Sequence, residues 1–179
     1  MPKSATILLI RHAEKSGDAN DAGLTAAGQA RAQAYVAYFP SLTRDMGVPA
    51  PSFLIAAADS PNSIRSRLTL TPLSQSLGLP IEADIADHDY PRLADRLLAE
   101  ARYDHATTLV CWHHGQLLSL AQALGADEQA LPKLWPDAVF GWLLRLEYGP
   151  AGRLANIDVR NQQLMFGDGI GQAGGQLPH

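Results

Sequence analysis

The sequence has one cysteine, no long apolar run and no cluster of basic residues, and each shortage excludes a class of protein. The lone Cys111 excludes an internal disulfide framework and a cysteine-based zinc site. No run of about 18 apolar residues occurs, so we expect no membrane span, and the apolar run at 5–10 is too short for a signal peptide. Charged residues make up only 18% of the chain and the net charge is −4, so we expect neither nucleic acid nor an anionic membrane as partner. We therefore expect a cytoplasmic protein.

Apolar residues are abundant and predict one folded unit. They make up 46% of the 179 residues, which is too high for a disordered chain and enough for a single core. We expect residues 1–179 to form one domain that ends in a loose, glycine-rich tail from about 168 to 179. The sequence does not indicate an oligomeric state.

Strand-like and helix-like segments alternate along the first two thirds of the chain. Continuous apolar runs at 5–10, 53–58 and 107–112 are typical of strands covered on both faces. Further strands are expected at 79–83, 139–148, 153–159 and 163–166. Helices are expected at 24–39 (Thr25 as N-cap, Pro40 as stop), 62–77 (kinked or split at Pro72, ended by Gly78), 91–103 and 116–124. The alternation predicts an α/β fold with three layers, α/β/α, in which helices cover both faces of a mostly parallel central sheet.

Basic side chains follow three of the predicted strands, at the point where each strand ends. Arg11 and His12 follow the first strand, Arg65 comes shortly after the second, and a His113–His114 pair follows the run at 107–112. Ligands of such sheets bind at the carboxyl ends of the strands, so these groups are expected to converge. Guanidinium groups match phosphate oxygens, and a neutral imidazole can attack phosphorus. Without a Walker motif or an obvious carboxylate cage for Mg²⁺, we expect a reaction that uses no metal and no cofactor.

Four motifs in order resemble one family. They are Leu9-Ile10-Arg11-His12-Ala13-Glu14, Leu24-Thr25-Ala26-Ala27-Gly28 with Ala32, Arg65-Ser66-Arg67-Leu68-Thr69, and Trp112-His113-His114-Gly115. Together they resemble the RHG-type signature and later motifs of the histidine phosphatase superfamily, the phosphoglycerate-mutase-like fold. The resemblance covers residues 6–125.

The resemblance implies a role for each matching residue. His12 would be the nucleophile that becomes phosphorylated, and Arg11 and Arg65 would clamp the phosphoryl group. A late histidine would complete the pocket: the spacing to an apolar Leu117 favours His113, and the His-Gly dipeptide favours His114. We favour His114 and expect His113 at the rim.

Other polar residues near these motifs are weaker candidates. Substrate contacts are expected from Glu14, Ser60 and Ser63. No acidic motif marks a general acid, so the candidates are the cluster of Asp87, His88 and Asp89, or no such residue at all.

These residues predict a phosphatase that hydrolyses phosphoric monoesters through a phosphohistidine, without a metal. Its substrate would be a small-molecule or peptide-borne phosphate ester, because acidic residues near the site, such as Asp18 and Asp21, would repel a polyphosphate. Alternatives are an inactive or weakly active phosphoester-binding module, a mutase-type phosphotransferase, and a metal site formed by His12, His113 and His114. Adjacent residues of an extended chain point in opposite directions, which disfavours the metal site.

Overall fold

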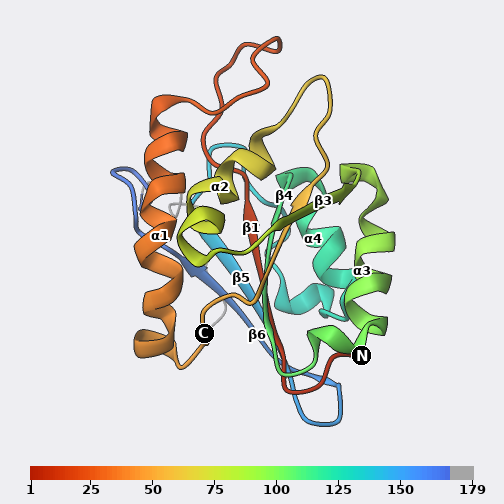
Figure 1. Cartoon of the computed structure of the whole chain (residues 1–179). Helices are drawn as coiled ribbons and strands as arrows, with labels where there is room; N and C mark the ends of the chain where they lie inside the picture. The colour runs from red at the N-terminus through yellow and green to blue at the C-terminus, as the bar shows by residue number, and fades with distance from the viewer. Residues whose placement is uncertain (170–179) are drawn as a thin grey trace.

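The computed structural model describes residues 1–169 and shows one sheet between two pairs of helices (Figure 1). The strands are β1 (Thr6–Arg11), β2 (Phe53–Ala57), β3 (Ile81–Ile85), β4 (Thr107–Trp112), β5 (Trp142–Tyr148) and β6 (Leu154–Asn161). The helices are α1 (Ala26–Met46), α2 (Arg65–Leu77), α3 (Tyr90–Ala99) and α4 (His114–Ala123). Among the described residues, no helix is long and apolar enough to cross a membrane.

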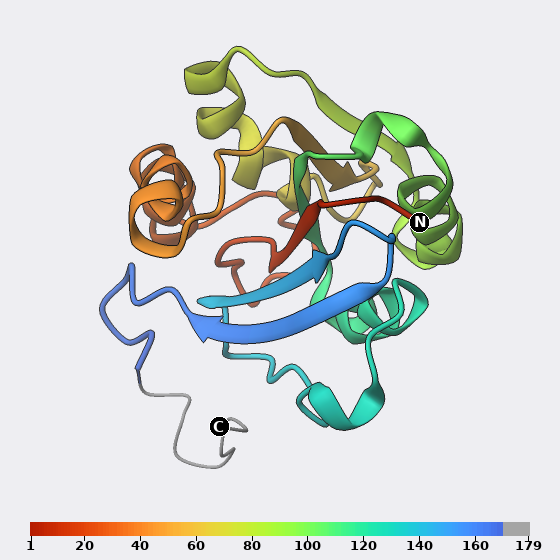
Figure 2. The ribbon, with the colours of Figure 1, turned by 90° about the horizontal axis from the view of Figure 1, so that it is seen from below.

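The six strands form a mixed, mostly parallel sheet in the order β3-β2-β4-β1-β5-β6. The pairs β2–β3, β2–β4 and β1–β4 are parallel, whereas β5 pairs antiparallel with both β1 and β6. Helices α1 and α2 cover one face and α3 and α4 cover the other, as the view along the sheet shows (Figure 2). The predicted three-layer α/β/α architecture is confirmed.

The position of strand β1 in the sheet explains why apolar residues follow one another in its sequence without alternating with polar ones. Ile7 and Leu9 face the core beneath α3 and α4, and Leu8 and Ile10 face the core beneath α1 and α2. All four side chains are at most 1% exposed. A central strand buried on both faces needs an apolar residue at every position, because successive side chains point to opposite faces.

Helix α1 begins directly after the predicted N-cap, Thr25, but it continues beyond the predicted stop at Pro40. The side chain of Thr25 accepts a hydrogen bond from the backbone N–H of Gly28, as an N-cap does. Pro40 lies inside the helix, which runs on to a left-handed Gly47 (φ 67°). The prediction of a stop at Pro40 is wrong because Phe39 and Leu42, on either side of it, are buried in the core and hold the helix on the sheet.

Pro72 likewise does not split α2. The helix runs unbroken from Arg65 to Leu77, and Gly78 ends it in the left-handed conformation (φ 66°) as predicted. Leu70 and Leu73 flank the proline and are fully buried, so packing offsets the hydrogen bond lost there, which costs about 3 kcal/mol.

Several predicted boundaries shift. Helix α2 begins at Arg65 and not at 62, because a short turn joins Ser60 to Ser63. Helix α3 ends at Ala99 and is followed by a separate 3₁₀ turn at 101–103. Helix α4 begins at His114, two residues earlier than predicted.

The segment after β6 also differs from its prediction. Residues 163–166 form no strand; they lead into a turn that is closed by hydrogen bonds from the backbone of Leu164 and Met165 to the carboxylate of Asp168. The tail predicted from 168 therefore begins with a well-packed residue, and its remainder, 170–179, lies outside the described residues.

Candidate active site

The sheet brings Arg11, His12 and His113 together at the carboxyl ends of two neighbouring strands. Arg11 is the last residue of β1 and pairs in register with Trp112, the last residue of β4. The backbone N–H of His12 then donates to the carbonyl of Trp112 (3.0 Å), so the two chains stay side by side one residue further on. Arg65, the first residue of α2, follows β2 at the same end of the sheet (Figure 1).

His12 is buried and its tautomer is fixed by the backbone. Its side chain Nδ1 lies 2.8 Å from the carbonyl oxygen of Ala13. A carbonyl only accepts, so Nδ1 carries the proton and Nε2 keeps its lone pair. Burial lowers the pKa of His12 to about 3, and nearby His113, Arg11 and Arg65 also lower it, against the opposing effect of the Ala13 hydrogen bond. The ring is therefore neutral near pH 7 and its Nε2 is a competent nucleophile.

One nitrogen of Arg11 is bound to a loop, while two others have no partner. Nη1 donates to the carbonyls of Asp137 (2.6 Å), Val139 (3.2 Å) and Pro136 (3.4 Å). The ring of Phe140 packs on the guanidinium, 3.9 Å from its central carbon. Nε and Nη2 are buried without a hydrogen-bond partner among the described residues.

Arg11 makes no direct ion pair with a carboxylate of residues 1–169. Burial lowers its pKa to about 10, although Asp137 and Glu14 partly oppose that shift. Leaving buried donors unpaired costs about 1–3 kcal/mol each, and an oxyanion placed against Nε and Nη2 would remove that cost.

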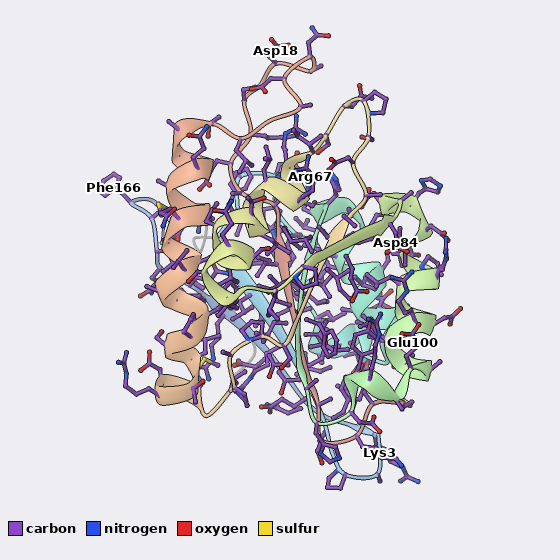
Figure 3. All side chains as sticks on the ribbon, in the orientation of Figure 1. Lys3, Asp18, Arg67, Asp84, Glu100 and Phe166 are labelled. Atoms are coloured by element: carbon purple, nitrogen blue, oxygen red, sulfur yellow. The ribbon has the colours of Figure 1, made fainter. Side chains whose placement is uncertain are left out.

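Two nitrogens of the Arg65 guanidinium, Nε and Nη2, also bind a neighbouring loop. Its side chain is buried, with Nε donating to the carbonyl of Gly23 (3.0 Å) and Nη2 donating to that of Asp21. These bonds tie α2 to the loop between β1 and α1, whose tip near Asp18 projects from the molecule (Figure 3). Each arginine therefore uses one part of its guanidinium to fix a neighbouring loop.

The two late histidines, His113 and His114, have different neighbours in the structure. The ring of His113 lies edge-on to that of His12, with centroids 5.0 Å apart, whereas Nε2 of His114 lies 2.7 Å from Oδ1 of the exposed Asp137. His113 keeps extended backbone after β4 and His114 is the first residue of α4, so their side chains diverge. This geometry favours His113 over His114 as the second histidine of the candidate site, the reverse of our expectation. Burial lowers the pKa of His113 to about 4, with Arg65 contributing.

The three residues expected to contact substrate, Glu14, Ser60 and Ser63, have other partners in the structure. Glu14 has its carboxylate bound by the guanidinium of Arg31, with a shortest distance of 2.7 Å. The hydroxyl of Ser63 accepts the backbone N–H of Arg65 (3.4 Å), which places it at the start of α2. Ser60 is exposed and pairs with Ser63 through the backbone.

Of the three candidates for a general acid, Asp87 has the most unusual environment. It begins the 3₁₀ turn at 87–89 after β3, and its Oδ1 is buried without a hydrogen-bond partner among the described residues 1–169. Burial raises its pKa to about 6, although the hydrogen bond from His113 opposes the shift. His88 is exposed, and Asp89 makes only a long contact with Arg92 (3.8 Å).

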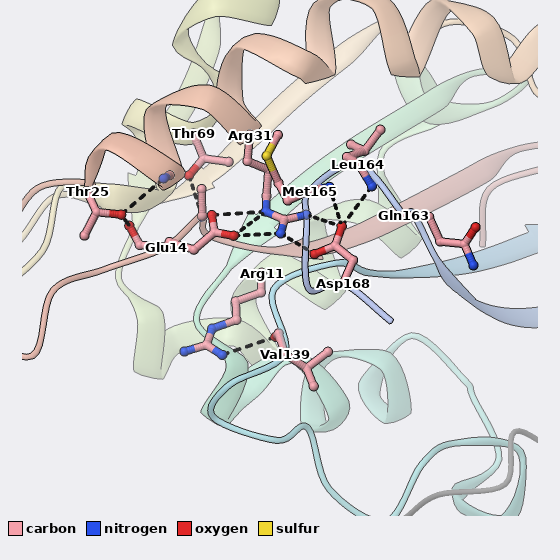
Figure 4. Close-up of polar contacts among 12 residues, drawn as sticks. Arg11, Glu14, Thr25, Arg31, Thr69, Val139, Gln163, Leu164, Met165 and Asp168 are labelled. Atoms are coloured by element: carbon pink, nitrogen blue, oxygen red, sulfur yellow. Dashed lines mark hydrogen bonds and ion pairs between the residues drawn. The ribbon is translucent and has the colours of Figure 1, made fainter. Parts of the chain in front are cut away.

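Sequence reasoning missed two parts of this site. One is the loop 136–140, which surrounds Arg11 with carbonyls and places Phe140 6.3 Å from the ring of His12, centroid to centroid. The other is the ion cluster of Glu14, Arg31 and Asp168 (Figure 4). Arg31 lies in the alanine-rich helix α1, and its charge on the buried face of that helix was the available signal.

Groups of three or more His, Cys, Asp or Glu side chains able to hold a metal ion do not occur within residues 1–169. His12, His113 and His114 do not form one, because His114 is directed to Asp137.

Comparison with known proteins identifies the fold. No family model matches the chain, and no curated protein sequence does. Among solved structures, the protein histidine phosphatase SixA bound to tungstate matches with a TM-score of 0.58 and 17% identity, over 87% of this chain and 94% of that one. A mycobacterial glucosyl-3-phosphoglycerate phosphatase bound to inorganic phosphate matches with 0.60 and 14%, over 89% and 98%. Phosphoglycerate mutase from Plasmodium falciparum matches with 0.57 and 15%, over 89% and 90%.

Proposed function

We propose that this chain, which has the fold of the histidine phosphatase superfamily, is a phosphatase that hydrolyses phosphoric monoesters through a phosphohistidine at His12. The observation that carries the proposal is the pairing of a buried, neutral His12, its Nδ1 proton held by Ala13, with an adjacent Arg11, two of whose buried donors have no partner within residues 1–169. The tungstate and phosphate bound by two of the structural neighbours are tetrahedral oxyanions of the kind that these donors fit.

The first step transfers the phosphoryl group to His12. Nε2 attacks phosphorus, the ester P–O bond breaks, and the leaving oxygen takes a proton from the carboxyl of Asp87. Arg11 and Arg65 neutralise the charge on the phosphoryl oxygens, and His113, beside His12, donates a further hydrogen bond to them. Most of the catalysis then comes from positioning and charge stabilisation, as phosphoryl transfer requires.

The second step returns the enzyme to its starting state. Water attacks the phosphorus, the P–N bond to His12 breaks, and the Asp87 carboxylate takes the proton from the water. Inorganic phosphate leaves and His12 is again neutral. No residue in this cycle requires a metal or a cofactor.

The substrate is proposed to be a small-molecule or peptide-borne phosphate ester. The exposed Asp137 and the acidic loop 18–21 lie near the arginines and would repel extended polyanions. A binding module without turnover is the second candidate, because it needs only Arg11, Arg65 and His12 and not an acid.

Turnover of p-nitrophenyl phosphate separates the two candidates. Wild-type protein should hydrolyse it in the presence of a chelator, and His12→Asn should abolish the reaction. Phosphate or vanadate binding by wild-type protein without turnover of any ester would support the binding module, and activity that survives His12→Asn would contradict the proposal.

A further inference from the structure

Asp168 attaches the segment after β6 to the candidate site. Its carboxylate is 6% exposed, contacts Nη1 (3.1 Å) and Nη2 (2.5 Å) of Arg31, and accepts the backbone N–H groups of Leu164 (2.9 Å) and Met165 (3.0 Å) (Figure 4). Apolar contacts hold this segment only weakly: Leu164 packs on the core beneath α1, but Phe166 is fully exposed (Figure 3). The carboxylate therefore attaches this segment to α1, in addition to the backbone hydrogen bond from Gln162 to the carbonyl of Gly141 (2.7 Å).

Arg31 connects Asp168 to Glu14. Its side chain is 1% exposed, and Nε (3.0 and 3.1 Å) and Nη2 (2.7 Å) bind the carboxylate of Glu14. One buried guanidinium thus lies between two carboxylates from opposite ends of the chain. Burial alone would lower the pKa of Arg31, but the hydrogen bonds to Asp168 and Glu14 outweigh it and raise the pKa.

The backbone of Glu14 is fixed as tightly as its side chain. Its carbonyl accepts the backbone N–H (3.0 Å) and the hydroxyl (3.2 Å) of Thr25. Helix α1 approaches so closely that a Cβ at Gly28 would lie 2.5 Å from the same carbonyl oxygen. On the other side, the N–H of Ala13 donates to the hydroxyl of Thr69 (2.9 Å). The peptides on both sides of the Ala13–Glu14 peptide are therefore held in place, which restricts its rotation.

That peptide sets the tautomer of His12, because its oxygen is the carbonyl of Ala13 that receives the Nδ1 proton. If the peptide rotates, the carbonyl leaves Nδ1 and the ring is free to turn or to exchange tautomers.

Asp168 also touches the loop on the other side of Arg11. A Cβ at Gly141 would lie 2.8–3.0 Å from the carboxylate atoms of Asp168, so the carboxylate packs directly on the backbone at that point. The preceding residue, Phe140, stacks on Arg11. One side chain therefore supports both segments that flank the pair Arg11–His12.

We propose that Asp168 is a positioning residue for His12: through Arg31 and Glu14 it fixes the Ala13 carbonyl that holds Nδ1, and against Gly141 it fixes the loop that carries Phe140. The consequence for the tautomer rests on the geometry alone, and the consequence for turnover rests on the proposed phosphatase activity.

The tautomer is measured by NMR on protein labelled with ¹⁵N-histidine at pH 7, where the His12 signals are assigned by their loss in His12→Asn. Wild-type protein should show a protonated Nδ1 and an unprotonated Nε2. Asp168→Ala should move both signals towards tautomeric averaging, and Asp168→Asn should move them less, because its amide oxygen still accepts hydrogen bonds. Gly141→Ala displaces the carboxylate without removing it and should reproduce the effect of Asp168→Ala.

Two matched variants control for charge and for the added methyl group. Asp158→Asn removes a carboxylate of β6 that pairs with Arg145 and Arg160, and Gly149→Ala adds a Cβ that would meet only ordinary contacts near 3.8 Å. Both should leave the His12 signals as they are in wild-type protein.

Kinetics supply the second readout. Asp168→Ala should lower kcat for p-nitrophenyl phosphate about tenfold while KM changes less, as expected when a reacting group is misplaced rather than a binding group lost. Folded Asp168→Ala and Gly141→Ala with wild-type His12 signals would overturn the proposal, and so would failure of all three variants to fold, since Asp168 would then serve folding alone. If wild-type protein has no phosphatase activity, the proposed function fails and the NMR result still decides the role of Asp168.

Discussion

The ring of His113 lies against that of His12, with the ring planes at 66° and the centroids 5.0 Å apart, while the ring of His114 is directed to Asp137. Two adjacent residues thus have different surroundings because the chain changes from strand to helix between them. A hydrogen bond from His113 could reach an oxyanion bound at His12, whereas His114 is held at the exposed side of the loop 136–140.

The two histidines should therefore respond differently to substitution. His113→Asn should lower kcat/KM for p-nitrophenyl phosphate by about 100-fold, the loss typical of removing one donor to developing charge. His114→Asn should change it by less than about threefold, since it loses only a partly exposed pair with Asp137. Equal losses, or a larger loss for His114→Asn, would reverse the assignment.

Asp87 should matter most for esters with poor leaving groups. Burial raises its pKa to about 6, so the protonated carboxyl is present below that pH and disappears above it. The kcat/KM for an alkyl phosphate should therefore fall above about pH 6. Asp87→Asn should lower it by about 100-fold and remove the decline, because a general acid contributes at least that factor. For p-nitrophenyl phosphate, whose leaving group needs little protonation, the loss should be only a few-fold; equal losses for both esters would exclude this role.

The buried His12 should make the protein sensitive to acid. Its pKa is lowered by burial to about 3 in the folded state, against about 6.5 in the unfolded chain, so between these values the unfolded chain binds more protons. The free energy of unfolding must then fall as the pH falls, and at pH 5 this residue accounts for about 2 kcal/mol of that fall.

Urea denaturation at pH 7 and pH 5 measures this effect. His12→Gln should reduce the difference between the two pH values by about 2 kcal/mol. The surface substitution His88→Gln serves as control and should leave the difference unchanged. A variant at position 12 that is as acid-sensitive as the wild type would show that the ring is not buried in its neutral form.

The sequence predicts the layers well, and it also predicts that Arg11, His12 and His113 lie close together, for a physical reason. Strands β1 and β4 are buried on both faces and therefore read as continuous apolar runs, and the groups that follow them converge because the two strands are parallel neighbours. Arg11, His12 and Arg65 could thus be placed at one edge of the sheet from the sequence.

The rest depends on information that is not local. The choice between His113 and His114 turns on the residue at which α4 begins, and patterns place helix ends only to within a few residues. Pro40 and Pro72 are tolerated because distant core residues pack around them. The contact between Arg31 and Asp168 joins residues that are 137 positions apart, and Asp168 lies in a segment that we expected to be a loose tail. No periodic pattern in the sequence predicts such a contact.

Trapping of the covalent intermediate tests the central claim most directly. The protein is mixed with an activated phosphate monoester, quenched within one turnover under alkaline conditions that preserve phosphohistidine, and digested for mass spectrometry. We predict one phosphorylated peptide, modified at His12, that is absent from His12→Asn and accumulates in Asp87→Asn, because loss of the base slows hydrolysis of the intermediate more than its formation from an activated ester. Turnover without any phosphorylated His12, or a label that persists in His12→Asn, would contradict the account.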